Sequence, residues 1–70
     1  MIAESEYREM VTKAGFVRVY WRYLCRERLL RPKLTQEAAY EELEGAFFER
    51  YGGNQWPSYD AFRKARVKWS

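Results

Sequence analysis

The stretch TQEAAYEELEGAFFERYGGNQWPSYDAFRKARVKW, residues 35–69, decides the fold class. Its first part repeats apolar residues at helical spacing. The glycine pair at 52–53 then favours a helix end, because glycine reaches the left-handed conformation without steric cost. Ser58 follows and is typical of an N-cap. The stretch therefore predicts two helices, over residues 35–51 and 58–69, joined by a short loop.

The upstream residues continue the helical pattern. Apolar residues recur at helical spacing over residues 5–30, and Pro32 ends that segment because the residue before a proline avoids helical geometry. Gly15 costs roughly 1 kcal/mol relative to alanine inside a helix, so we expect a break near it. No segment alternates apolar and polar residues with the period of two that is typical of a β-strand. The chain is therefore predicted to be all-α, a small three-helix bundle with a long first helix.

Two apolar stripes run along opposite sides of the first segment. The core stripe contains Tyr7, Met10, Ala14, Val17, Trp21 and Leu24. The second stripe contains Phe16, Val19, Tyr23 and Leu30. An exposed stripe of this kind usually marks an interface, so it predicts a homodimer unless an N-terminal helix folds back over it. Trp21 and Phe62 are predicted core anchors, and Cys25, beside Trp21, is predicted to be a buried, inert thiol.

The composition excludes several kinds of chemistry. The chain has 70 residues, is 47% hydrophobic and 19% aromatic, and is therefore expected to form one folded domain. It has no histidine, a single cysteine and a single aspartate, Asp60. A Ser-His-Asp or Cys-His catalytic set, a zinc site and a disulfide cannot be built within one such chain. We expect a protein that is not an enzyme, with no cofactor, metal or small-molecule substrate.

The N-terminus has the wrong charge for a targeting signal. A secretory signal begins with positively charged residues, whereas this chain begins with Glu4, Glu6 and Glu9. No apolar segment follows them. No stretch approaches the ~20 apolar residues of a membrane span. A single free thiol is also typical of a reducing compartment. The sequence therefore predicts a cytoplasmic protein with no membrane partner.

The net charge of +3 is distributed unevenly along the chain. Residues 1–34 carry +4, residues 35–51 carry −4, and residues 52–70 carry +3. One interpretation is intramolecular complementarity, with an acidic helix between two basic segments. The other is that one basic surface faces an anion such as DNA.

Two helices followed by a basic C-terminal helix resemble the trihelical, homeodomain-like helix-turn-helix modules over residues 35–69. The resemblance is carried by Ala38, Ala39, Leu43, Ser58, Tyr59, Phe62, Arg63 and Lys64. The connection of about six residues is longer than the usual three to four, which leaves the angle between the helices open. The resemblance implies that the outer side of the last helix faces bases or phosphates. Those residues are Arg63, Lys64, Val67 and Lys68.

Three further predictions concern polar side chains outside that set. Asn54 and Gln55, at the loop tip, are candidates for a backbone phosphate contact, with Trp56 packed beneath the loop. Arg66 is expected at the core edge or in an ion pair with a glutamate. A second basic surface is predicted at every fourth residue of the first segment, although such a stripe is more often a solvated face than a phosphate-binding surface. Its members are Arg18, Arg22 and Arg26.

Two functions remain open on this basis. The first is a small DNA-binding accessory or regulatory protein of helix-turn-helix type. The alternative is a helical protein-interaction module, in the form of a homodimer, with no role in nucleic-acid binding. Basic residues near a helix C-terminus also favour the helix dipole, which accounts for Arg66 and Lys68 without a ligand. A steep loss of affinity for duplex DNA with rising salt would distinguish the two functions.

Overall fold

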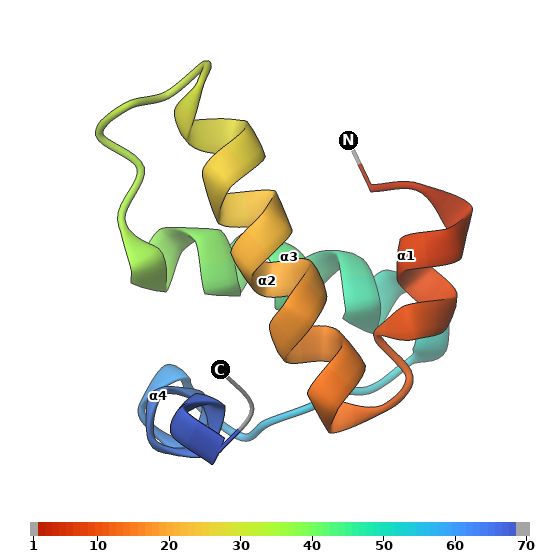
Figure 1. Ribbon diagram of the computed structural model, residues 1–70. Helices are drawn as coiled ribbons and strands as arrows, with labels where there is room; N and C mark the ends of the chain where they lie inside the picture. The colour runs from red at the N-terminus through yellow and green to blue at the C-terminus, as the bar shows by residue number, and fades with distance from the viewer. Residues whose placement is uncertain (1, 69–70) are drawn as a thin grey trace.

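The computed structural model describes residues 2–68 (Figure 1). This part of the chain contains four α-helices and a terminal 3₁₀ turn, joined by short loops. The elements are α1 (Glu4–Glu9), α2 (Lys13–Arg28), α3 (Gln36–Tyr51), α4 (Tyr59–Ala65) and η1 (Arg66–Lys68). In Figure 1, α2 crosses α3, α1 lies at one side, and α4 lies at the lower end. The predicted all-α class is confirmed. None of the helices within residues 2–68 is both long and apolar enough to cross a membrane.

The predicted first helix is two helices with a turn between them. α1 ends at Glu9 and α2 begins at Lys13, so the break precedes Gly15 by a few residues. The Thr12 hydroxyl caps α2 by accepting a hydrogen bond from the Gly15 N–H at 3.0 Å. Met10 in the turn is fully buried. The predicted break is therefore present, and a capping threonine followed by a buried glycine defines it.

The start of α1 differs from the sequence prediction. Ala3, rather than Ser5, occupies the N-cap position. A Glu6 carboxylate oxygen accepts a hydrogen bond from the Ala3 N–H at 3.1 Å, and the Ala3 carbonyl oxygen accepts from the Glu6 N–H at 3.0 Å. Backbone and Glu6 atoms thus hold the helix start without a side-chain cap from Ala3. Ser5 instead lies inside α1.

Gly15 is required because the backbones of α1 and α2 meet at this position. A Cβ atom added at Gly15 would overlap the Glu9 carbonyl oxygen and contact the Thr12 hydroxyl. Only glycine allows so close an approach. Gly45, in the interior of α3, has open space where its Cβ would be.

We expect these two glycines to respond in opposite directions to alanine substitution. Gly15→Ala should destabilise the protein by about 1–3 kcal/mol through overpacking. Gly45→Ala should stabilise it by about 0.5–1 kcal/mol, since alanine favours a helix interior. Chemical denaturation of both variants measures the difference. A Gly15→Ala variant as stable as wild type, or more stable, would contradict the close packing of α1 on α2.

The ends of α3 and α4 follow the sequence prediction. The Thr35 hydroxyl accepts from the Ala38 N–H at 3.1 Å, and the Ser58 hydroxyl accepts from the Ala61 N–H at 3.2 Å. Gly52 adopts the left-handed conformation with φ 81° and ends α3. The predicted third helix becomes 3₁₀ after Ala65. Trp69, the last residue of the predicted helix 58–69, lies outside the described residues.

An aromatic cluster forms the core, and Phe62 is at its centre. Phe62 is fully buried, and four aromatic rings lie with centroids 4.6–5.8 Å from its own. They belong to Phe16, Tyr20, Tyr40 and Trp56. The prediction that Phe62 is a core anchor is confirmed. Trp21, the second predicted anchor, is only partly buried at the edge of the cluster.

The predicted second stripe is not an exposed surface. Phe16 and Val19 are fully buried and Tyr23 is 8% exposed, all within a single chain. The physical reason is that α2 packs against both α1 and α3, which cover its two apolar sides. The predicted interface is therefore wrong for these three residues, whereas Leu30 is 80% exposed.

Cys25 is exposed, so its predicted burial is also wrong. It lies three residues after Arg22 and seven after Arg18, on the same side of α2 as these two exposed arginines. The core side of the helix at this level is taken by Leu24, which is 3% exposed.

Candidate nucleic-acid interface

α4 and η1 present the predicted DNA-contacting residues to solvent. α4 directs Phe62 into the core, and the four outward side chains are all exposed. We call them the α4 surface: Arg63, Lys64, Val67 and Lys68. The exposed fraction of the Lys64 side chain is 74%, so its ammonium group is accessible to a ligand.

Asp60 is the one carboxylate on this side of α4. Its oxygens lie 2.6 Å from an Arg63 guanidinium nitrogen and 3.2 Å from the Lys64 ammonium. Hydrogen bonds from Arg63 and Lys64 lower the pKa of Asp60. Both pairs are solvent-exposed and therefore weak, so a phosphate can replace Asp60 as the partner of either cation.

Arg66 joins η1 to the rest of the bundle instead of extending to solvent. Its guanidinium donates to the Gln36 side-chain oxygen at 3.0 Å and to the Tyr20 hydroxyl at 3.3 Å. The same group lies 5.3 Å from the Trp21 ring centroid. The predicted place at the core edge is correct, but its hydrogen-bond partners are an amide and a phenol.

The loop between α3 and α4 is tied down at Gln55. The side-chain amide nitrogen of Gln55, Nε2, donates to the carbonyl oxygen of Met10 at 2.7 Å and to that of Val11 at 3.0 Å. Its donors thus hold the α1–α2 turn, which takes Gln55 out of the predicted phosphate contact. Asn54 is exposed. Trp56 is 5% exposed, as predicted, and the Lys13 ammonium lies 5.1 Å from its ring centroid.

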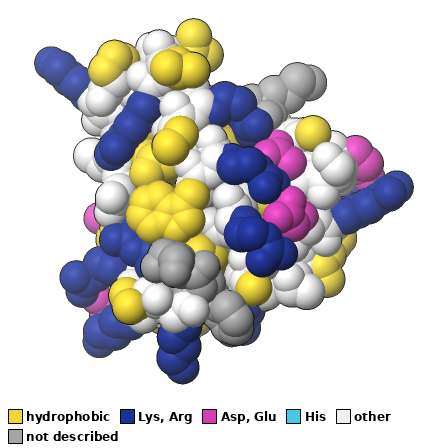
Figure 2. Space-filling model, in the orientation of Figure 1, with side chains coloured by type: hydrophobic (Ala, Val, Ile, Leu, Met, Phe, Trp, Pro, Cys, Tyr) yellow, Lys and Arg dark blue, Asp and Glu magenta, His cyan; other side chains and the backbone are white. Residues whose placement is uncertain are grey.

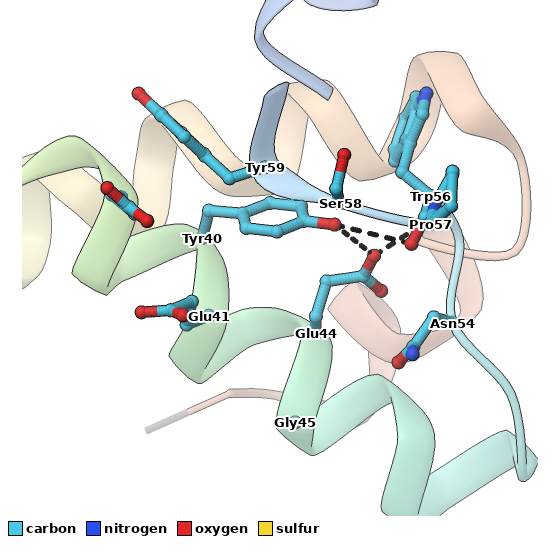
Figure 3. A pocket seen from close by; sticks show the side chains of 10 residues that line it. Tyr40, Glu41, Glu44, Gly45, Asn54, Trp56, Pro57, Ser58 and Tyr59 are labelled. Carbon is cyan, nitrogen blue, oxygen red and sulfur yellow. Dashed lines mark hydrogen bonds between the residues drawn. The ribbon is translucent and has the colours of Figure 1, made fainter. Parts of the chain in front are cut away.

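A buried carboxylate fixes the direction of this loop. Glu44 is 6% exposed and accepts three hydrogen bonds, of which Figure 3 shows the one from Tyr40. The donors are the Tyr40 hydroxyl at 2.6 Å, the Gln55 N–H at 2.9 Å and the Trp56 N–H at 2.9 Å. The connection from α3 to α4 is long, but this carboxylate holds its backbone in place.

Helical periodicity alone places Glu44 on the outer, acidic side of α3 with Glu37 and Glu41, and the structure shows that this placement is wrong. Burying a charge is costly unless hydrogen bonds compensate for it, and here three donors do so. Two of them are backbone N–H groups of a loop that helical periodicity does not describe. The one local signal is Tyr40, which lies four residues earlier on the same side of α3.

A pocket of about 450 Å³ opens beside this carboxylate, between α3 and residues 54–59 (Figure 3). We call it the α3–α4 pocket. Tyr40, Pro57 and Tyr59 contribute apolar surface, and Glu37 and Glu41 add exposed carboxylates. Burial and the hydrogen bond to Glu44 raise the pKa of the Tyr40 hydroxyl, so it stays protonated.

The predicted second basic surface is paired with the carboxylates of α1. Arg18 lies 3.0 Å and Arg22 2.5 Å from oxygens of Glu9, and Arg26 lies 3.2 Å from an oxygen of Glu6. In Figure 2, Lys or Arg side chains adjoin Asp or Glu side chains at the right of the molecule, on the side where Figure 1 places α1. These pairs lie within residues 1–34 and do not test the predicted complementarity with the acidic segment 35–51. The Arg31–Glu42 pair, at 2.8 Å, does join that segment to the basic first part of the chain.

These ion pairs predict loss of stability in acid. Arg22 and Arg18 lower the pKa of Glu9, and Arg31 and Tyr23 lower that of Glu42 to about 2 from 4.5. A carboxylate whose pKa is depressed on folding stabilises the protein above its unfolded pKa and loses that effect as pH falls through the folded value. We expect Tm to fall between about pH 4.5 and pH 2.

Thermal unfolding followed at a series of pH values measures this effect. The decrease should be shallower in 1 M salt, where the Debye length is only about 3 Å and the exposed pairs are screened. A Tm that stays constant down to pH 2 would contradict the role of these ion pairs.

The predicted site residues thus fall into three separate places. The α4 surface is exposed, Asn54 lies on the loop, and the arginines of α2 lie beside α1. No known family model, curated protein or solved structure matches the chain. The α4 surface is the part of the predicted site that combines exposure, positive charge and a rigid support.

Proposed function

We propose that the chain is a small, non-enzymatic DNA-binding protein with a helix-turn-helix-like arrangement, and that α4 is its reading helix. The observation that carries the proposal is the two-sided character of α4. Phe62 fixes one side in the aromatic core, while Arg63 and Lys64 extend from the other. An α-helix fits the major groove, where arginine and lysine side chains reach base edges and phosphates.

The rigidity of the α3–α4 connection supports this proposal. A reading helix needs a fixed orientation, because its side chains must meet bases in a defined register. Glu44 holds the backbone of Gln55 and Trp56, and Ser58 caps α4 directly afterwards. The length of the connection is thus compatible with a fixed angle between the two helices.

The charge of the C-terminal part also supports DNA as the partner. Residues 59–68 carry four cations against one carboxylate, Asp60. In Figure 2, Lys and Arg side chains gather at the lower left of the molecule, where Figure 1 places α4. Val67, 71% exposed, lies among them and is suited to contact a thymine methyl group.

Fluorescence anisotropy with a labelled duplex over a salt series tests the proposal. Lys64→Ala and Lys68→Ala should each lower the slope of log K against log salt by about one if the lysine contacts a phosphate. Arg63→Ala should weaken binding about tenfold or more at a preferred site and relax specificity there.

Arg8→Ala on α1 is the matched control, because it removes one exposed cation outside the α4 surface. Circular dichroism first establishes that each variant is folded. The proposal is wrong if all three α4 variants bind DNA as the wild-type chain does, or if the Arg8 variant loses as much affinity as they do.

A protein-interaction module is the second candidate function, and one observation favours it. Leu29 and Leu30, after the end of α2, are 84% and 80% exposed. Two adjacent leucines with this exposure indicate a contact surface that is separate from α4.

A further inference from the structure

The segment between α2 and α3 is a rigid projection with an apolar end. We call residues 28–33 the α2–α3 tip. Arg31 donates to Glu27 at 2.8 Å and to both carboxylate oxygens of Glu42 at 2.8 Å. Arg28 donates to the carbonyl oxygen of Leu34 at 3.0 Å, just beyond the tip. These bonds hold the backbone of the tip while Leu29 and Leu30 stay in water.

This rigidity makes the two leucines suited to binding. A segment that is already ordered loses little conformational entropy when it binds, so more of the apolar contact appears as affinity. Leu34, at the base of the tip, is buried and anchors it to the core. Leu29 and Leu30 therefore extend from a fixed support.

The α3–α4 pocket has the complementary chemistry. Tyr40, Pro57 and Tyr59 provide apolar surface for an aliphatic side chain (Figure 3). Glu37 and Glu41 are exposed, and neither forms an ion pair with another residue in the range 2–68. A ligand for this pocket should carry both an aliphatic group and positive charge.

The tip has both properties, with two leucines beside Arg28 and Lys33, neither of which forms an ion pair with a carboxylate in the range 2–68. In Figure 1 the tip projects at the upper end and α4 lies at the lower end, so a chain does not fill its own pocket with its own tip. We propose that the α2–α3 tip of one copy of this chain docks into the α3–α4 pocket of a second copy. The leucines pack on Pro57 and Tyr59, and Arg28 and Lys33 face Glu37 and Glu41.

This contact joins two different surfaces and is therefore heterologous. It replaces the predicted stripe interface, of which only Leu30 is exposed. It does not depend on DNA binding, because neither the tip nor Glu37 and Glu41 belong to the α4 surface.

Mixing two complementary variants tests the proposal. Leu29→Ser/Leu30→Ser removes the apolar side chains of the tip and leaves the pocket unchanged. Glu37→Lys/Glu41→Lys reverses the charge of the pocket and leaves the tip unchanged. Sedimentation of the full chain at several concentrations should show a mass that increases with concentration for wild type and a monomer for each variant. An equimolar mixture should form 1:1 dimers and nothing larger, because only one working contact per pair remains.

Phe48→Ser is the control, because Phe48 is an exposed apolar residue outside both surfaces and its loss should leave the association unchanged. Circular dichroism shows whether each variant is folded. A wild-type monomer at millimolar concentration, or a mixture that stays monomeric, overturns the proposal. Leucine-dependent binding of a monomeric wild type to phosphatidylserine vesicles would also overturn it and identify a membrane as the occupant.

Discussion

Phe62→Ala is expected to lower the free energy of unfolding by about 3–5 kcal/mol, the range for removing a buried phenylalanine side chain. Phe62 is fully buried, and its ring contacts aromatic rings from α2, from α3 and from the loop before α4. Small domains have total stabilities near the lower end of about 5–15 kcal/mol. The variant should therefore be largely unfolded at 37 °C.

Urea denaturation followed by circular dichroism measures this loss. Phe48→Ala on α3 is the matched control, because Phe48 is 53% exposed and its truncation leaves no buried cavity. If Phe62→Ala melts with the wild-type midpoint, the assigned core side of α4 is wrong. The outward direction of Arg63 and Lys64 would then be wrong as well.

Glu44→Ala is expected to cost about 3 kcal/mol, because it removes the acceptor of three donors, and only the Tyr40 hydroxyl keeps another one, the Trp56 carbonyl oxygen at 3.4 Å. Those donors are the Tyr40 hydroxyl and the N–H groups of Gln55 and Trp56. Glu44→Gln should cost less, since the amide keeps one acceptor oxygen. In both variants the loop before α4 loses part of its support.

Hydrogen exchange identifies where this cost arises. The amides of Gln55 and Trp56 should exchange faster in Glu44→Ala than in wild type, and those of α2 should change less. Glu41→Ala provides the control, because Glu41 is exposed one turn earlier on α3 and its removal should be close to neutral. Unchanged exchange at Gln55 and Trp56 would contradict the role of Glu44 in positioning α4.

The helix boundaries that depend on local chemistry could be predicted from the sequence. Thr35 and Ser58 cap their helices through side-chain bonds that span three residues, and Gly52 ends α3 by its own conformational freedom. The burial of Phe62 also follows from the helical spacing of a single segment. Such features need no knowledge of the rest of the chain.

The features that sequence reasoning missed depend on contacts between distant residues. α1 pairs Glu6 and Glu9 with arginines 9–20 positions later, which places a separate helix beside α2. Glu44 is buried because backbone donors 11 and 12 residues away reach it. Helical periodicity assigns a glutamate to the outside and does not describe a loop that folds back over it.

The candidate site divides in the same way. The exposure of Arg63, Lys64 and Lys68 could be predicted, since they lie opposite Phe62 on one short helix. The bonding of the Gln55 side chain within the chain could not be predicted, because its acceptors are carbonyl oxygens of the distant α1–α2 turn.

An NMR titration of the ¹⁵N-labelled full chain with a short duplex at low salt tests the central claim most directly. Binding by α4 predicts amide shift changes concentrated at residues 58–68, with the amides of α1 almost unchanged, and their reversal when salt is added. The contradicting result is an absence of shifts at millimolar duplex, or shifts confined to Arg18, Arg22 and Arg26. In the second case DNA would displace Glu6 and Glu9 from the arginines of α2, and α4 would not be the reading helix.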